Sequence, residues 1–136
     1  MTEIKSDLVT INNSAVHIYN FLTNFDNFRK LMPEQVINWK SNPYSCSFTI
    51  KGMADISLTT SEKTPYSKIV WTTAGKAPFD FSLSSVIDEK NKSQVDAQII
   101  LHADLSPMLK MMALRPLTNF VNILVHKLKE VSEAGN

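Results

Sequence analysis

The spacing of hydrophobic residues changes twice along the chain and divides it into three parts. After a short first strand, apolar residues recur every three or four positions from 15 to 31, alternate with polar residues from 35 to 104, and return to helical spacing from 107 to 131. A period near 3.6 is that of an amphipathic helix, whereas a period of two is that of a strand with one face in water. The chain therefore predicts helices on both sides of a central run of strands.

The first part predicts one strand and two short helices. Residues 4–12 are moderately apolar and include several β-branched side chains, as strands often do. Ser14 is placed to cap a helix, because its hydroxyl can accept from a free amide of the first turn. After a break at Asn24, Asp26 can cap a second short helix, which Pro33 ends.

The central part predicts six consecutive antiparallel strands. The alternation breaks at residues that favour turns, among them Pro43, Gly52 and Pro65, and again at 75–78 and 88–93. The inward positions carry most of the large apolar side chains. We assign to this face Ile37, Trp39, Cys46, Phe48, Ile50, Ala54, Ile56, Leu58, Ile69, Trp71, Thr73, Phe79, Phe81, Leu83, Val95, Ala97, Ile99 and Leu101.

The last part predicts one long helix. Ser106 can cap it, and Pro107 suits its first position, where no amide donor is needed. Pro116 falls inside the pattern and cannot donate to the preceding turn, so we expect a kink there or two helical pieces. Residues 132–136 have the composition of a frayed tail.

This order of elements resembles the helix-grip fold of the START, birch-pollen-allergen and polyketide-cyclase superfamily, often called SRPBCC. The resemblance rests on the serine-capped helix, break and proline at 14–33, on the strand pairs around Gly52 and Trp71, and on the closing helix at 107–131. It implies a single α+β domain over residues 1–136. In such a domain a curved, seven-stranded antiparallel sheet, in the order β-α-α-β6-α, wraps around the long C-terminal helix and leaves an apolar cavity between them.

We expect a small hydrophobic ligand, of lipid or polycyclic type, to bind in that cavity. Flexible methionines such as Met108 and Met112 can line an adaptable pocket, but they can equally fill gaps in a core. The inward aromatic residues have the same two interpretations, since they can wall a pocket or plug it. The candidate ligand-binding residues are Trp39, Phe48, Ile50, Ile56, Leu58, Trp71, Phe81, Leu83, Ile99, Leu101, Met108, Met112 and Phe120.

Composition and charge exclude several other classes of function. The 136 residues carry 14 basic and 13 acidic side chains, a net charge of +1, and only three glycines. Such a balance gives no long-range field to attract nucleic acid or anionic lipid, and the chain has no glycine-rich loop for a nucleotide phosphate. No stretch approaches the roughly 18 apolar residues of a membrane span, so stable membrane insertion is not expected.

Neither a metal site nor a catalytic group is predicted. His17, His102 and His126 fall on outward faces, and no spacing brings them together. Cys46 has the inward register of a small core residue and no neighbouring base that would favour a nucleophile. Aspartates of the strands, such as Asp96, take outward positions where a solvated face is expected. We therefore expect no cofactor, no metal and no catalytic residue.

Two alternative functions stay open. The resemblance permits an aromatase or polyketide cyclase, in which polar residues orient a chain-like substrate. It also permits an interaction module similar to the quinone-chaperone and chaperone-activator branches, with outward aliphatic residues forming a homodimer contact. The residues for the first are Tyr19, Tyr66, Thr60 and Thr73, and those for the second are Val70, Val86 and Ile100.

The N-terminal residues indicate a cytoplasmic protein. They are polar and of mixed charge, without the apolar segment of a secretory signal. Cys46 is the only cysteine, which excludes an internal disulfide and suits a reducing compartment.

Overall fold

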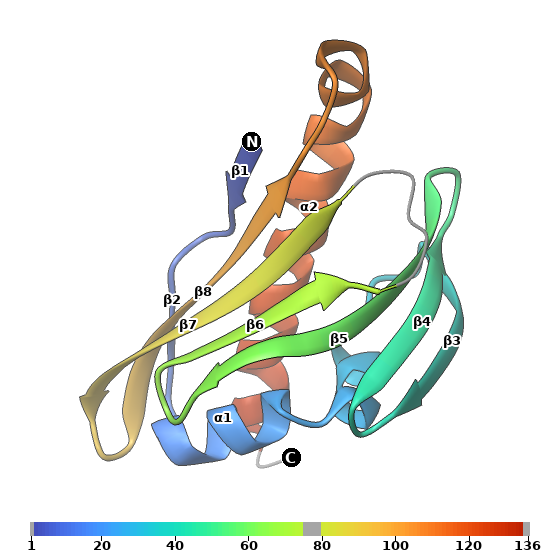
Figure 1. Cartoon of the computed structure of the whole chain (residues 1–136). Helices are drawn as coiled ribbons and strands as arrows, with labels where there is room; N and C mark the ends of the chain where they lie inside the picture. Colours follow the sequence, from blue (N-terminus) through green and yellow to red (C-terminus); the bar gives the residue numbers. More distant parts are fainter. Residues whose placement is uncertain (1, 75–79, 135–136) are drawn as a thin grey trace.

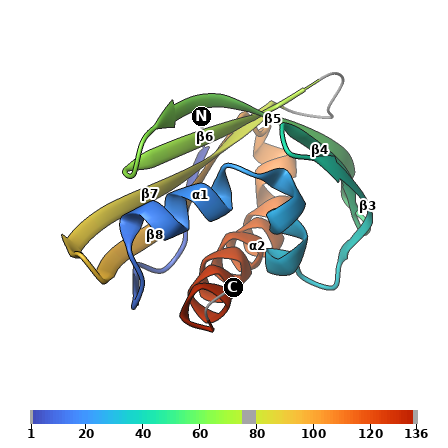
Figure 2. The ribbon, with the colours of Figure 1, turned by 90° about the horizontal axis from the view of Figure 1, so that it is seen from below.

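A curved antiparallel sheet holds the long C-terminal helix against its concave face (Figures 1 and 2). The structure, a computed structural model, describes residues 2–74 and 80–134. The sheet order is β1-β8-β7-β6-β5-β4-β3, with β2 also paired to β8. The elements are β1 (Thr2–Lys5), β2 (Val9–Ile11), α1 (Ala15–Leu22), the 3-10 helix η1 (Phe25–Leu31), β3 (Val36–Asn42), β4 (Ser45–Ile50), β5 (Ala54–Thr64), β6 (Lys68–Thr73), β7 (Phe81–Asn91), β8 (Gln94–Ala103) and α2 (Pro107–Glu133).

The α+β helix-grip fold and the six central strands are confirmed. All six pair antiparallel with their neighbours, and alternate side chains face α2 as the period of two predicted. The alternation fails at Ile37, which was expected to face inward and is 37% exposed. The next residue, Asn38, has a φ of 56° and lies at a register shift in β3. Phe79 lies outside the described residues.

The strand expected at 4–12 is divided in two, which makes eight strands instead of seven. Both pieces pair with β8, and Ser6 marks the break between them. The Ser6 backbone amide donates to the Ile99 carbonyl at 2.9 Å, and the Ile99 amide donates to the Ser6 hydroxyl at 2.9 Å. A side-chain oxygen thus replaces a main-chain acceptor at this point, and the regular ladder is interrupted.

The helix starts follow local capping chemistry, with one correction. The Ser14 hydroxyl accepts from the His17 amide at 3.1 Å, as predicted. The cap of η1 is Asn24, whose side chain accepts from the amide of Asp26 at 2.9 Å, so the prediction that Asp26 is the cap was wrong. Asp26 instead lies in the first turn, where a carboxylate is favoured by the helix dipole.

Helix α2 is continuous, so the alternative of two helical pieces was wrong. Ser106 caps it as expected, accepting from the Leu109 amide at 3.2 Å, and Pro116 lies inside the helix without ending it. The helix also includes Ser132 and Glu133, which the sequence placed in a frayed tail. The Asn12 amide donates to the Glu133 carboxylate at 2.9 Å, and this contact with a distant segment holds the last turn.

Asp96 joins three strands on the outer face of the sheet. Its carboxylate accepts from the Thr10 hydroxyl of β2 at 2.7 Å and pairs with the Lys90 ammonium of β7 at 2.9 Å. These partners leave Asp96 only 9% exposed, whereas the sequence placed it on a solvated face. Hydrogen bonds from Lys90 and then from Thr10 hold the pKa of Asp96 below its usual range.

This lowered pKa predicts an acid-dependent loss of stability. A carboxylate whose pKa is lower in the folded state stabilises the fold above its unfolded pKa, about 3.9, and loses that contribution as the pH falls through the folded value. Asp96→Asn should therefore lower the free energy of unfolding near pH 7, and its difference from the wild type should shrink as the pH falls below about 4. Urea unfolding at several pH values measures this difference. A constant difference down to pH 2 would contradict the proposed role of ionised Asp96.

Candidate functional site

An apolar pocket of about 340 Å³ opens between the first turns of α2 and the turn that joins β4 to β5. Its walls come from both sides of the sheet–helix interface, near the end of the molecule where α2 begins (Figure 1). The lining residues are Gln35, Ile50, Lys51, Gly52, Met53, Leu109, Met112, Ala113, Pro116, Leu117 and Phe120.

The sheet side of the pocket depends on a tight turn. Gly52 has a φ of 76°, a left-handed conformation that glycine adopts without strain. The Met53 amide donates to the Ile50 carbonyl at 2.9 Å, and the Lys51 amide donates to the Gln35 carbonyl at 2.8 Å. These bonds close the turn and attach it to the segment before β3, so that Ile50 and Met53 form one wall.

The helix side is hollow because Ala113 has a small side chain. Ala113, Leu117 and Phe120 follow one another on the buried face of α2. The Leu117 and Phe120 side chains fill the space between α2 and the sheet, whereas the small Ala113 side chain leaves part of that space open. Ala113, Leu117 and Phe120 thus form the helix wall of the pocket.

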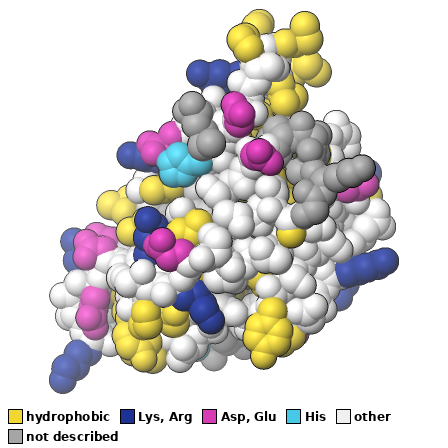
Figure 3. Space-filling model, in the orientation of Figure 1, with side chains coloured by type: hydrophobic (Ala, Val, Ile, Leu, Met, Phe, Trp, Pro, Cys, Tyr) yellow, Lys and Arg dark blue, Asp and Glu magenta, His cyan; other side chains and the backbone are white. Residues whose placement is uncertain are grey.

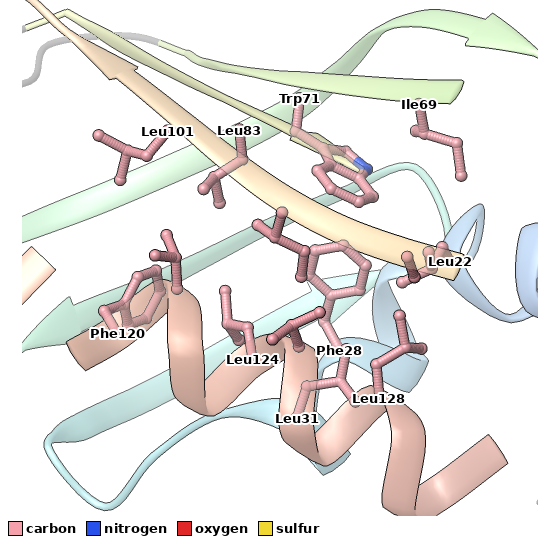
Figure 4. Packing of buried hydrophobic residues seen from close by; sticks show 14 of the residues in the cluster. Leu22, Phe28, Leu31, Ile69, Trp71, Leu83, Leu101, Phe120, Leu124 and Leu128 are labelled. Carbon is pink, nitrogen blue, oxygen red and sulfur yellow. The ribbon is translucent and has the colours of Figure 1, made fainter. Parts of the chain in front are cut away.

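Beyond Phe120 the space between sheet and helix is filled with side chains (Figure 4). The Phe28 ring of η1 meets the Trp71 ring of β6 edge-on, with centroids 4.7 Å apart and planes at 79°. Leu83 and Leu101 point from the sheet toward α2, and Trp71 is only 1% exposed. This half of the interior is a packed core.

The candidate ligand-binding residues are divided between pocket, core and surface. Ile50, Met112 and Phe120 line the pocket. Trp39 is half-buried and stacks on Phe48 with centroids 5.5 Å apart, and Met108 is 73% exposed. The candidates that lie in the packed core are Phe48, Ile56, Leu58, Trp71, Phe81, Leu83, Ile99 and Leu101.

Several lining residues were missed by the sequence reasoning. Leu109 and Leu117 have the spacing of the buried helix face. Met53 directly follows the turn residue Gly52, and Pro116 interrupts the helical pattern at 107–131. The small size of Ala113 was also visible, but only in combination with the turn at Gly52 does it indicate a pocket. Gln35 and Lys51 carried no signal, because their positions depend on how the chain folds before β3.

The pocket wall carries little polar chemistry. Gln35 and Lys51 supply its polar side chains among the described residues. The polar residues considered for a cyclase lie elsewhere: Tyr19 packs edge-on against Tyr66 with centroids 5.4 Å apart, on α1 and the β5–β6 turn, away from the start of α2 (Figure 1). Thr60 and Thr73 do not line the pocket either.

Two of the three histidines contact carboxylates of the N-terminal segment, and these two do not meet each other. His102 Nε2 lies 2.9 Å from the Glu3 carboxylate, and His126 Nε2 lies 2.9 Å from the Asp7 carboxylate. His17 is half-buried on α1. Over residues 2–74 and 80–134 the structure contains no group of three or more histidine, cysteine or acidic side chains arranged to hold a metal ion.

Cys46 lies in the core at the far end of β4 and is 4% exposed. Burial raises the pKa of its thiol to about 12. Since the thiolate is the reactive form, we predict that Ellman's reagent will label Cys46 very slowly in the native protein at pH 8 and stoichiometrically in denaturant. Absorbance at 412 nm measures the reaction, with free cysteine as the control. Rapid labelling of the folded protein would contradict this burial.

The outward aliphatic residues Val70, Val86 and Ile100 are half-buried on the convex face of the sheet. Ser84 stands between Val70 and Ile100 in the strand register, so a hydroxyl interrupts the apolar surface. In Figure 3 most of this face is white, the colour of the backbone and of side chains that are neither charged nor hydrophobic, and no large hydrophobic patch covers its centre. Among the described residues, no helix has the length and hydrophobicity needed to cross a membrane.

Comparisons with known proteins support the fold. No protein-family model and no curated protein matches the sequence. A START superfamily protein from Mycobacterium smegmatis is 14% identical with a TM-score of 0.71, over 98% of this chain and 99% of that one. The Aha1 dimer structure from Colwellia psychrerythraea is 18% identical with a TM-score of 0.69, over 100% and 99%. The di-domain ARO/CYC protein BexL, from the BE-7585A biosynthetic pathway, is 14% identical with a TM-score of 0.70, over 96% and 46%.

Proposed function

From the helix-grip fold that this chain shares with START, Aha1 and ARO/CYC structures, we propose that the protein binds a small hydrophobic molecule in the pocket between α2 and the β4–β5 turn. The supporting observation is the lining itself, which consists mostly of aliphatic, methionine and phenylalanine side chains. Ligand pockets are typically concave and apolar with a few polar groups that orient the ligand. Acidic, histidine, cysteine and hydroxyl side chains are absent from the described lining, which favours binding over catalysis.

The pocket volume limits the size of the ligand. At about 340 Å³ it lies near the lower end of the roughly 300–1,000 Å³ of ligand pockets. A compact ring system fits this space, whereas a long acyl chain would enter with one end and leave the rest outside. Affinity would come chiefly from apolar ligand surface removed from water, at about 25 cal/mol per Å² before entropic costs.

The polar atoms of the pocket favour an amphiphile. Lys51 lies exposed at the rim and can attract an anionic or polar end of the ligand. Met112 and Pro116 both line the pocket, and because Pro116 has no amide hydrogen, the Met112 carbonyl lacks its usual helical donor and is free to accept from a ligand hydroxyl. The proposed ligand thus has an apolar body and one polar end.

A titration with an environment-sensitive naphthylamine probe tests this function. Probe fluorescence should rise on binding, and decanoic acid and 1-decanol should displace the probe more strongly than decane, which lacks a polar end. Native mass spectrometry of the purified protein, followed by solvent extraction, identifies any molecule that copurifies. A protein that binds neither the probe nor any of these compounds, and that carries no extractable ligand, does not have this function.

A further inference from the structure

The first two turns of α2 expose an unusual amount of hydrophobic surface. Met108 is 73% exposed, Met111 is 87% exposed and Met112 is 70% exposed, and Leu114 in the next turn is 42% exposed. We call these four residues the methionine tip. Single exposed aliphatic residues are common, but a cluster on one helix end marks a site of interaction.

The methionine tip projects beyond the sheet. In Figure 1 the start of α2 rises past the ends of the neighbouring strands, and Figure 3 shows hydrophobic side chains gathered at that end of the molecule. Met108 and Met111 are three residues apart and share the face of the helix opposite buried Ala113 and Leu117. The tip is therefore convex and can enter a deformable or concave partner.

The net charge of the chain is only +1, but the turns of α2 that carry the tip have basic side chains and no acidic ones. Lys110 and Arg115 are exposed on the same turns, and α2 contains no acidic residue before Glu130. Exposed Lys51 adds a third basic residue on the adjacent turn, across the pocket. Two exposed acids lie next to these turns: Asp104 precedes the cap residue Ser106, and its amide donates to the Asp80 carbonyl at 3.0 Å. Apolar side chains flanked by lysine and arginine are the pattern of helices that bind anionic membrane surfaces.

The size of the tip argues against a second copy of the chain as the partner. A standard protein interface buries about 800 Å² on each side and is well packed. Four side chains on two turns of one convex helix offer much less than this. A lipid surface needs no preformed complement, because acyl chains adapt to flexible methionine side chains.

The tip also adjoins the mouth of the pocket, since Met112 belongs to both. We propose that the start of α2 docks this protein reversibly on an anionic lipid surface, with Met108 and Met111 among the acyl chains and Lys110 and Arg115 at the headgroups. A ligand that enters the pocket beside Met112 then passes directly between lipid and protein. Docking goes beyond the proposed function, because the tip can bind lipid whether or not the pocket holds a ligand.

Cosedimentation with vesicles tests the proposal. Wild-type protein should bind vesicles of phosphatidylcholine with phosphatidylglycerol more strongly than vesicles of phosphatidylcholine alone. The preference should weaken between about 0.1 M and about 1 M salt, as the screening length falls from about 10 to about 3 Å. Met108→Glu/Met111→Glu should lower the partition coefficient at least tenfold. Lys110→Gln should lower it about fivefold on anionic vesicles only, the factor that corresponds to about 1 kcal/mol for one basic residue.

A matched double variant controls for charge and folding. Leu8 is 64% exposed and Tyr44 is 81% exposed, and both lie away from the start of α2, so Leu8→Glu/Tyr44→Glu adds the same charge elsewhere. It should bind vesicles within twofold of the wild type, and both double variants should keep the wild-type Tm because all four positions are exposed.

Three results would overturn the docking proposal. The first is that wild-type protein stays in the supernatant with anionic vesicles. The second is that both double variants lose the same amount of vesicle binding. The third is that the protein forms a concentration-dependent dimer, which Met108→Glu/Met111→Glu dissociates. Probe binding separates this proposal from the proposed function. Vesicle binding without probe binding refutes only the pocket, and probe binding without vesicle binding refutes only the docking.

Discussion

Trp71→Ala is expected to lower the free energy of unfolding by about 3–5 kcal/mol, the usual cost of truncating a large buried aromatic residue. Trp71 is 1% exposed and meets Phe28 edge-on at 4.7 Å, so its removal leaves a cavity that neighbouring strands cannot close. Urea unfolding followed by circular dichroism measures the change. A loss below about 1 kcal/mol would mean that this part of the interior is not a packed core.

Trp71→Phe is the matched control for this change. The indole nitrogen of Trp71 is buried without a hydrogen-bond partner among the described residues. An unpaired buried donor costs about 1–3 kcal/mol, and phenylalanine removes this cost while keeping a ring against Phe28. We expect Trp71→Phe to lose much less stability than Trp71→Ala. Equal losses in the two variants would show that the ring contact with Phe28 contributes little.

Ala113→Phe is expected to weaken ligand binding at least tenfold while the protein remains folded. Ala113 is 2% exposed and lines the pocket at the point where the small side chain leaves it open. A phenyl ring at this position occupies the volume that the ligand would fill, and the affinity that comes from apolar burial is lost. Probe titration gives the change in Kd, and thermal unfolding gives the change in Tm.

Leu114→Phe is the matched control, because it places the same ring at the next position of α2, which is 42% exposed and outside the pocket lining. Its Kd should equal that of the wild type. Overpacking at Ala113 can cost about 1–3 kcal/mol, so binding is compared at a temperature well below the Tm of both variants. Unchanged affinity in folded Ala113→Phe would refute the proposed position of the ligand.

Local chemistry was the most predictable part of this fold. Ser14 and Ser106 cap their helices because a serine hydroxyl can reach an amide three residues on, whatever the rest of the chain does. Asp26 was misjudged as a cap because Asn24, two residues earlier, has the same capacity and lies before the first turn. The division of the first strand at Ser6 depended on Ile99, far away in the sequence, and was not predictable.

The site was predictable only as a layer between sheet and helix. The period of two identified the faces of Trp71 and Ile50 correctly, yet one lies in the packed core and the other in the pocket wall. Their register carries no information on what opposes them across the interface. Phe28, from a 3-10 helix, fills the space under Trp71, whereas the turn at Gly52 leaves the space beside Ala113 open.

The sequence by itself determined the order of helical and strand segments, the serine caps of α1 and α2 and the buried face of most strands, because periodicity and capping depend on neighbouring residues. The tertiary structure decided how far each buried face is covered. Helix α2 has 27 residues, or about 40 Å at 1.5 Å per residue, and its start projects past the sheet. Met108 and Met112 therefore lie at the surface, although their spacing fits an interior pocket equally well. Coverage depends on the relative lengths and positions of distant elements, which no local pattern contains.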